Sequence, residues 1–188
     1  MGHLRGFSQV RESFASGAVE SSTYAGGLVA QISNGRSTLE QNYATGAVKG
    51  NNGIGGFLGV CFCNNSNQNI IQDNYASGRV VGNQNVGGFA GISGDIFLRI
   101  LSTGKVDRDA SETAIGGLIG AFWNPDGPRN VPDGFWDKDA SGRTTSAGGQ
   151  GKSTTEMFGS SLYTNYDATL WKFDSRSYPT LQWQWTAP

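Results

Sequence analysis

Two acidic turns contain the residues of this chain that are best suited to bind a cation. Asp137, Asp139 and Ser141 stand at alternating positions and Gly142 follows, as in the first half of a calcium-binding loop. Carboxylate and hydroxyl oxygens are the ligands that Ca²⁺ prefers. The twelfth position of such a loop is Gly148 instead of Glu, so the loop is incomplete. We predict calcium as an optional ligand here, with an ordinary solvated turn as the alternative, and no required cofactor.

A similar pattern stands thirty residues earlier, where Asp107, Asp109 and Ser111 have the same spacing. If the two turns stack, their four carboxylates lie in rows ~5 Å apart. Such rows motivate a second function, because hydrolases and lyases on β-helical scaffolds use carboxylates, a bound cation or both. That alternative, a carbohydrate-active or other small hydrolase or lyase, rests on analogy of fold. The sequence leaves catalysis open and favours a non-catalytic role.

Other reactive residue types form weaker patterns. The single histidine, His3, lies near the N-terminus, which argues against a Ser-His-Asp or Cys-His arrangement. Cys61 and Cys63 are too few for a metal site. If both lie on one strand, they are also poorly placed for a relaxed disulfide, so we predict small buried side chains. Residues 148–153 contain Gly-Lys-Ser but lack the spacing of a phosphate-binding loop.

Composition excludes several partners. The chain has 29 glycines among 188 residues and 15% charged residues, whereas ordinary domains have about 7% and 25%. A hydrophobic content of 37% indicates a buried core. The net charge is −1, so we predict no nucleic-acid partner. We predict no membrane span, because no apolar stretch approaches ~18 residues. The opening residues lack the apolar region of a signal peptide.

A motif of about thirty residues recurs along the chain. Each copy has an aromatic residue or Leu, two small residues, Gly, any residue and Val, and then Gly-Gly-apolar. The copies begin at Phe14, Tyr43, Tyr75 and Leu101, and their glycine pairs begin at Gly26, Gly55, Gly87 and Gly116. The pairs are 29, 32 and 29 residues apart. A decayed fifth copy spans 137–149, and residues 6–13 resemble the end of an earlier one. Fixed periods of this length are typical of stacked repeat architectures.

The repeat predicts an all-β parallel β-helix, a β-solenoid of about five rungs with the right-handed sense, over residues 1–151. Each copy has short apolar runs broken by glycine and no helical stripe. Each strand then pairs in parallel with its equivalent in the next coil. We expect the glycine pairs to adopt positive φ and to let successive coils approach closely.

Stacking of equivalent residues predicts ladders. One contains the aromatic residues and Leu that begin the copies, for which core packing is favoured over a cofactor-binding box. A second contains valines and a third apolar residues after the glycine pairs. These are Val19, Val48, Val80 and Val106, and Leu28, Phe57, Phe89 and Leu118. Asn42 and Asn74 are in register and predict an amide ladder.

Residues 152–188 depart from the repeat and are predicted to cap the open end of the solenoid. Ser153 and Glu156 form a possible capping box for a short helix that ends near Tyr163. Residues 170–173 and 178–185 read as strands, the second with alternating apolar residues. An alternative is that Trp183 and Trp185 form a platform on which a sugar stacks.

The repeat resembles the GLUG motif of bacterial surface proteins, which occurs in large adhesins and haemagglutinin-like proteins. The similarity covers about residues 6–185, and it includes 134–137, 146–149, 153–157 and 177–183. It implies a secreted or cell-surface bacterial β-solenoid with a structural or adhesive role, and it implies no catalytic residues. A glycan or a host or cell-surface protein is then the expected partner. The chain departs from the motif at 99–101 and in the widened turn 107–114.

The first coil has no evident cover, and bare strand edges are templates for further pairing. We therefore expect either that the chain is the C-terminal part of a longer solenoid, or that it forms a homodimer through its N-terminal face. A head-to-head contact would hide both edges at once.

Overall fold

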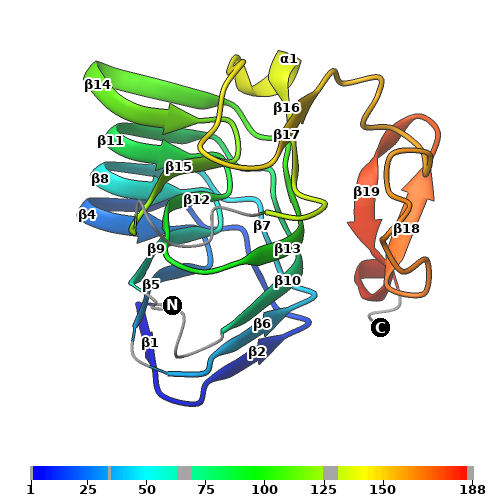
Figure 1. Cartoon of the computed structure of the whole chain (residues 1–188), viewed down its shortest axis with the longest axis horizontal. Coiled ribbons are helices and arrows are strands. Elements are labelled where there is room, and N and C mark those ends of the chain that lie inside the picture. Colours follow the sequence, from blue (N-terminus) through cyan, green and yellow to red (C-terminus); the bar gives the residue numbers. More distant parts are fainter. Residues whose placement is uncertain (1, 34, 63–68, 125–130, 186–188) are drawn as a thin grey trace.

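The computed structural model describes residues 2–33, 35–62, 69–124 and 131–185, apart from the side chains of 108–113. Four complete turns of a β-solenoid follow one another along the chain (Figure 1). The first turn contains β2 (Gln9–Arg11), β3 (Phe14–Ala15), β4 (Val19–Gly26) and β5 (Val29–Ser33). The second contains β6 (Thr38–Glu40), β7 (Tyr43–Ala44), β8 (Val48–Gly55) and β9 (Leu58–Phe62).

The later turns use longer strands. The third contains β10 (Ile70–Ala76), β11 (Val80–Gly87) and β12 (Ala90–Ser93), and the fourth β13 (Phe97–Ser102), β14 (Val106–Gly116) and β15 (Ile119–Phe122). Partial turns flank them, namely β1 (His3–Arg5) before, and β16 (Phe135–Asp137), α1 (Lys138–Ser141) and β17 (Gln150–Lys152) after. The chain ends with β18 (Trp171–Asp174), β19 (Ser177–Leu181) and the 3-10 helix η1 (Gln182–Trp185).

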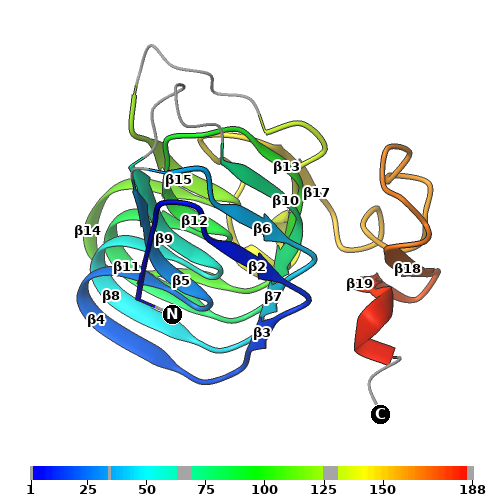
Figure 2. The same cartoon turned by 90° about the horizontal axis from the view of Figure 1, so that it is seen from below.

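Three parallel sheets form the faces of the solenoid. Sheet A has the order β1-β5-β9-β12-β15, and sheet C has the order β14-β11-β8-β4. Sheet B runs β17-β16-β13-β10-β6-β2, with β3 and β7 alongside. Viewed from the N-terminal end, the coils superpose as one ring (Figure 2). The predicted register is confirmed, since Val19, Val48, Val80 and Val106 pair in succession. We expected about five rungs, but the solenoid has four complete turns. Much of the fifth copy does not form a coil and instead covers the C-terminal end of the solenoid, as described below.

Close approach of the coils explains the glycines. A Cβ at Gly56 would lie 2.3 Å from the carbonyl oxygen of Gly88, and one at Gly78 would lie 1.9 Å from that of Gly46. The glycine pairs therefore let neighbouring coils approach closely, as expected, and so do the single glycines of the Gly-x-Val motif. The expectation of positive φ is wrong for the glycine pairs of the four regular copies, although Gly149 in the decayed fifth copy has a φ of 86°. Positive φ falls a few residues earlier, at the bend in each strand of sheet C, on Tyr24, Gly53, Asn85 and Ala114.

Two apolar cores lie inside the coils. The larger one contains the predicted ladder Leu28, Phe57, Phe89 and Leu118, of which no member is more than 3% exposed. The rings of Phe57 and Phe89 stack with centroids 4.7 Å apart. The smaller core contains Val48, Val80 and Val106, which confirms that these valines point inward.

The predicted amide ladder is confirmed in sheet B. Nδ2 of Asn42 donates to Oδ1 of Asn74 at 3.1 Å and to the carbonyl oxygen of Val10 at 2.9 Å. Nδ2 of Asn74 donates to the carbonyl oxygen of Leu39 at 2.8 Å. Both asparagines are fully buried, so each amide satisfies backbone groups of a neighbouring coil that water cannot reach.

Residues 138–149, here called the end cover, close the C-terminal end of the solenoid. Nε of Arg143 donates to the carbonyl oxygen of Val106 at 2.9 Å, and the backbone nitrogen of Gly117 donates to that of Thr145 at 3.0 Å. The backbone nitrogen of Ala147 donates to the carbonyl oxygen of Ile119 at 3.0 Å. The end cover thus satisfies edge groups of the fourth turn, which is why the fifth copy forms no complete coil.

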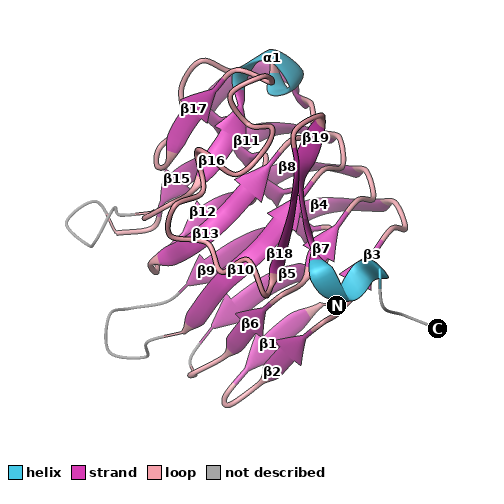
Figure 3. Cartoon of the chain, turned by 90° about the vertical axis from the view of Figure 1, so that its right-hand side faces the viewer, coloured by secondary structure: helices cyan, strands magenta, loops and turns pink. Residues whose placement is uncertain are grey.

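Residues 153–185, here called the strap, lie along the flank of the solenoid instead of over its end (Figure 3). A row of residues in register on sheet B, the aromatic ladder, faces outward and is made of Phe14, Tyr43, Tyr75, Leu101 and Phe135. The strap covers this ladder from Tyr43 to Phe135, whereas Phe14 stays 57% exposed. The ladder is therefore a packing core, as predicted, but it faces away from the coil interior. An outward apolar row must be covered, which accounts for the position of the strap.

The strap contains less regular structure than predicted. The capping box forms, since Oε2 of Glu156 accepts from the backbone nitrogen of Ser153 at 2.7 Å. It closes a turn and not a helix that continues to Tyr163. β18 and β19 pair antiparallel, but β19 ends at Leu181 and η1 follows. No helix in the described part of the chain is long and apolar enough to cross a membrane.

Candidate functional site

The predicted cation turn is the start of α1. Asp137 is fully buried and is the N-cap of this helix, because its Oδ1 accepts from the backbone nitrogens of Asp139 at 2.7 Å and Ala140 at 2.8 Å. Oδ2 of Asp139 accepts from the backbone nitrogen of Thr154 at 2.9 Å. Ser141 is buried, and its Oγ accepts from the backbone nitrogen of Arg143 at 3.2 Å. The three residues are adjacent, but protein donors occupy oxygens that a cation would use.

The second oxygen of Asp137 anchors the strap. Oδ2 accepts a hydrogen bond from the hydroxyl of Tyr178 at 2.6 Å. Burial, and then this hydrogen bond, raises the pKa of Tyr178 to about 12. Among the residues that the structure describes, no three His, Cys, Asp or Glu side chains gather as a metal site would require. The hydrogen bonds that Asp137 accepts from α1 and from Tyr178 give the turn a structural function.

The expected rows of carboxylates do not form between Asp107 and Asp137. Asp107 lies in β14 of sheet C and pairs with Val81, whereas Asp137 lies at the end of β16 in sheet B. Trp136 pairs with Ser102, which places Asp137 several residues out of register with Asp107. The similar sequences occupy different corners because the fifth copy leaves the coil path. The side chain of Asp109 lies outside the described residues.

Asp107 is held by two cations. Nε of Arg79 lies 2.7 Å from its Oδ2, and Nζ of Lys105 lies 3.3 Å from its Oδ1. Burial works in the opposite direction, but these two hydrogen-bonded cations hold the pKa of Asp107 below its usual value. The carboxylate is therefore ionised and paired at neutral pH.

The histidine and the cysteine have local contacts. His3 lies in β1, and its Nε2 is 2.6 Å from Oγ of Ser33. Cys61 is fully buried, as predicted, but it is disulfide-bonded. Strand β9 ends at Phe62, so the strand geometry assumed for the cysteine pair does not extend to Cys63, which lies outside the described residues.

The two C-terminal tryptophans have different environments. Trp183 packs against Tyr43 with ring centroids 5.5 Å apart, and its Nε1 donates to the carbonyl oxygen of Gln41 at 2.9 Å. Trp185 is 65% exposed, and Nζ of Lys172 lies 4.2 Å from its ring centroid. A 3-10 helix, η1, replaces the strand that would have placed Trp183 and Trp185 on the same face. Trp183 belongs to the packing of the strap.

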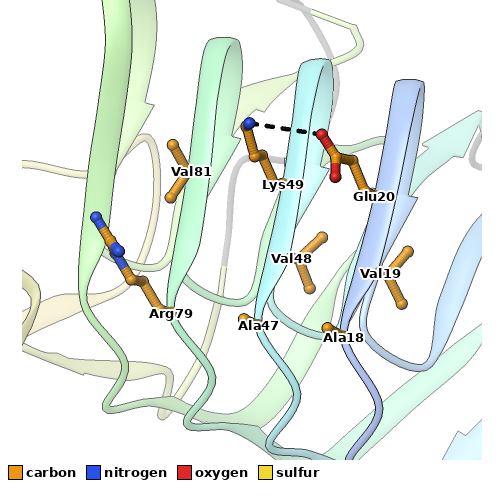
Figure 4. Close-up of a pocket in the computed structure, with 8 residues that line it drawn as sticks. All are labelled: Ala18, Val19, Glu20, Ala47, Val48, Lys49, Arg79 and Val81. Carbon is orange, nitrogen blue, oxygen red and sulfur yellow. Dashed lines mark ion pairs between the residues drawn. The ribbon is translucent and has the colours of Figure 1, made fainter.

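A groove lined by equivalent residues of successive turns lies on the outer corner of sheet C (Figure 4). It encloses about 390 Å³ and crosses the first three turns. Its lining residues come from equivalent positions and are Ala18, Val19, Glu20, Ala47, Val48, Lys49, Arg79 and Val81. We call it the corner groove.

The corner groove has a largely apolar floor and charged rims. Ala18 and Ala47 are small and exposed, so they leave space at the start of β4 and β8. Nζ of Lys49 lies 3.5 Å from Oε1 of Glu20 across the two strands. Both side chains are more than half exposed, so this ion pair contributes little to stability and is free to rearrange around a ligand.

A polar surface adjoins the corner groove. Ser21, Ser22, Asn51 and Asn83 line a shallow depression that shares Glu20 and Lys49 with the groove. Nδ2 of Asn83 donates to Oδ1 of Asn51 at 2.9 Å, so the amides are stacked from turn to turn. Hydroxyl and amide groups thus follow the apolar floor along the solenoid axis, which is the combination that an extended polar ligand with apolar faces requires.

No protein-family model, curated protein or solved structure matches this chain. Sequence reasoning did not single out Ala18, Ala47 or Arg79, although a signal was present. They are the variable residue of the Gly-x-Val motif, and a position that varies between copies of a structural repeat is one that packing does not fix.

Proposed function

We propose that this protein is a structural and adhesive repeat module of a bacterial protein that is secreted or displayed at the cell surface. The observation that carries the proposal is the corner groove, which the same positions of three successive turns create. Solenoids use extended surfaces of this kind to bind extended ligands. The resemblance of the repeat to the GLUG motif supports the surface location.

A glycan is the ligand class that the groove favours. Sugars have apolar CH faces and polar hydroxyl edges, which match the floor around Ala47 and the adjoining row of Asn51 and Asn83. The groove runs across the strands, so a glycan chain lying in it would meet equivalent groups once per turn. Its openness to solvent suits weak binding at each turn, and contacts at several turns then add to the affinity of a long chain.

Binding to a panel of neutral and acidic polysaccharides tests the proposal. Ala47→Trp fills the corner groove, and we expect it to reduce binding at least tenfold. Ala168→Trp is the matched control, because Ala168 is also exposed but lies in the strap. Equal affinity of the two variants would exclude the corner groove as the site.

The same samples distinguish the alternatives. If the chain binds host or cell-surface proteins but no glycan, the adhesive role holds and the ligand class is wrong. Chromatography of the incubated glycans detects cleavage, and shortened products would favour the hydrolase or lyase alternative over the adhesive one.

A further inference from the structure

The charged side chains of the corner groove and their ion-pair partners do not balance. The cations are Lys49 in the second turn, Arg79 in the third and Lys105 in the fourth, and each side chain is more than half exposed. The carboxylates are Glu20 in the first turn and Asp107 in the fourth. This set of described side chains therefore has three cations for two carboxylates, an excess of one positive charge.

The positive charge is concentrated at one end of the corner groove. Lys49 pairs with Glu20, whereas Arg79 and Lys105 share the single carboxylate of Asp107. The first turn contributes only the negative Glu20 to this set. An acidic group of a ligand is therefore attracted toward the third turn and repelled from the first.

Arg79 has hydrogen-bond donors that the protein leaves unused. It lines the end of the corner groove that faces the fourth turn (Figure 4). Its side chain donates to Oδ2 of Asp107 through Nε, at 2.7 Å. Arg99, by comparison, donates to Asp73 through both Nε and Nη2. In the part of the chain that the structure describes, the Nη groups of Arg79 have no acceptor, and two such groups form a fork that matches a carboxylate.

The apolar floor of the corner groove lies beside this fork. Ala18 and Ala47 occupy, in the first two turns, the position that Arg79 occupies in the third. Equivalent residues of neighbouring turns are ~4.8 Å apart. A uronic acid has an apolar CH face and a carboxylate on the same ring, so it can contact the alanine floor and the guanidinium at the same time. A neutral sugar can use the floor but offers the guanidinium no charged partner.

We propose that the corner groove binds an acidic polysaccharide, with a uronate carboxylate on Arg79 and sugar faces on the alanine floor. This inference rests on the proposed function and narrows its ligand class from glycans in general to acidic glycans. The exposed ion pair of Lys49 and Glu20 is weak, so Lys49 can turn to a second carboxylate one turn away. Glu20 disfavours an acidic group over the first turn, and the uneven charge therefore sets where along the groove the acidic groups bind.

Binding of polygalacturonate and of its methyl ester tests the proposal, because esterification removes the negative charges and keeps the sugar chain. At low ionic strength we expect the parent protein to bind polygalacturonate roughly tenfold more tightly than the ester, or better, since charge-assisted hydrogen bonds are the stronger ones. Added salt should reduce this preference, because it screens exposed charges.

Variants of Arg79 locate the acidic group. Arg79→Gln should reduce the preference for polygalacturonate to about threefold or less, and Arg79→Lys, which keeps the charge without the fork, should retain part of it. Arg176→Gln is the matched control, because Arg176 is also exposed but lies in the strap, and it should keep the full preference. An unchanged β spectrum shows that each variant is folded.

Four results would overturn the inference. If the ester binds as tightly as polygalacturonate and Ala47→Trp weakens both, the groove binds glycans without regard to charge, and the proposed function still holds. If Arg79→Gln keeps the same preference as Arg176→Gln, the acidic group binds elsewhere. If polyglutamate, which has carboxylates but no sugar rings, binds as tightly as polygalacturonate, charge alone attracts it. If the parent binds neither these polymers nor the wider panel, the proposed function fails as well.

Discussion

The close contact between stacked glycines predicts how a glycine-to-alanine substitution changes the stability of the solenoid. Gly17, Gly46, Gly78 and Gly104 are equivalent, but a Cβ at Gly78 would lie 1.9 Å from the carbonyl oxygen of Gly46, whereas one at Gly17 has nothing within 4 Å. Reaching even 3.0 Å at Gly78 requires a separation of about 1.1 Å. The same substitution, glycine to alanine, therefore has opposite consequences at two positions of one ladder.

The magnitude follows from what that separation breaks. Two backbone hydrogen bonds flank Gly78, from Ser77 to Ala44 at 3.0 Å and from Val48 to Arg79 at 2.8 Å. Overpacking costs about 1–3 kcal/mol, and each lost hydrogen bond costs about 0.5–1.5 kcal/mol. Gly78→Ala should thus lower the free energy of unfolding by about 2–6 kcal/mol. Gly17→Ala should raise it by up to ~1 kcal/mol, because alanine restricts the unfolded chain.

Urea unfolding followed by tryptophan fluorescence measures both variants. A low protein concentration keeps association between chains out of the measurement. If the two variants differ by less than ~0.5 kcal/mol, the coils accommodate a methyl group at no cost. The argument that glycine sets the coil spacing would then be refuted.

Three further predictions concern the inner core, the strap and the acidic turn. Val80→Asp buries an unpaired charge and should cost several kcal/mol, whereas Val81→Asp on the outer face should leave the melting temperature nearly unchanged; equal effects would contradict the register. The folded-state pKa of Tyr178 is about 12 against 10.0 unfolded, so its contribution to stability is complete below pH 10 and is lost as the pH rises to 12. Near-UV dichroism should therefore change in this range before the β signal, and simultaneous loss would argue against a separately docked strap. Asp137→Ala should lower the free energy of unfolding by about 1–2 kcal/mol in chelator, because it removes an N-cap; a loss seen only with calcium would favour the cation site.

The sequence was sufficient for what depends on the repeat. Val48 and Val80, or Phe57 and Phe89, stand at equal distances from their glycine pairs, and equal positions must stack in a solenoid. Length differences do not disturb this pairing. Ser33 pairs with Phe62 and Thr38 with Ile70, so the three additional residues of the second copy are confined to the corner between sheets A and B.

The sequence was insufficient where one pattern is compatible with two different environments. The sequence does not show whether the ladder from Tyr43 to Leu101 points into or out of the coil. An outward-facing row can also be apolar, because the strap covers it. Likewise, the fifth copy keeps the Asp-x-Asp pattern of 107–111 but begins a helix at Asp137. Only the hydrogen bonds between the end cover and the fourth turn show that the fifth copy leaves the path of the coils. Corner positions such as Ala18 attract notice only when three turns are seen together.

The contacts of the strap also determine when it can form. Trp183 is 142 residues from Gln41, its hydrogen-bond partner, and Trp171 is 98 residues from Asp73. Neighbouring coils need loops of only about thirty residues, whose closure is cheaper and faster. The coils should therefore assemble first, and the strap should join last, since its binding surface exists only once several turns are stacked. A chain with a misregistered coil would present a broken row and a loose strap, so a protease that cleaves the strap would select against misfolded molecules.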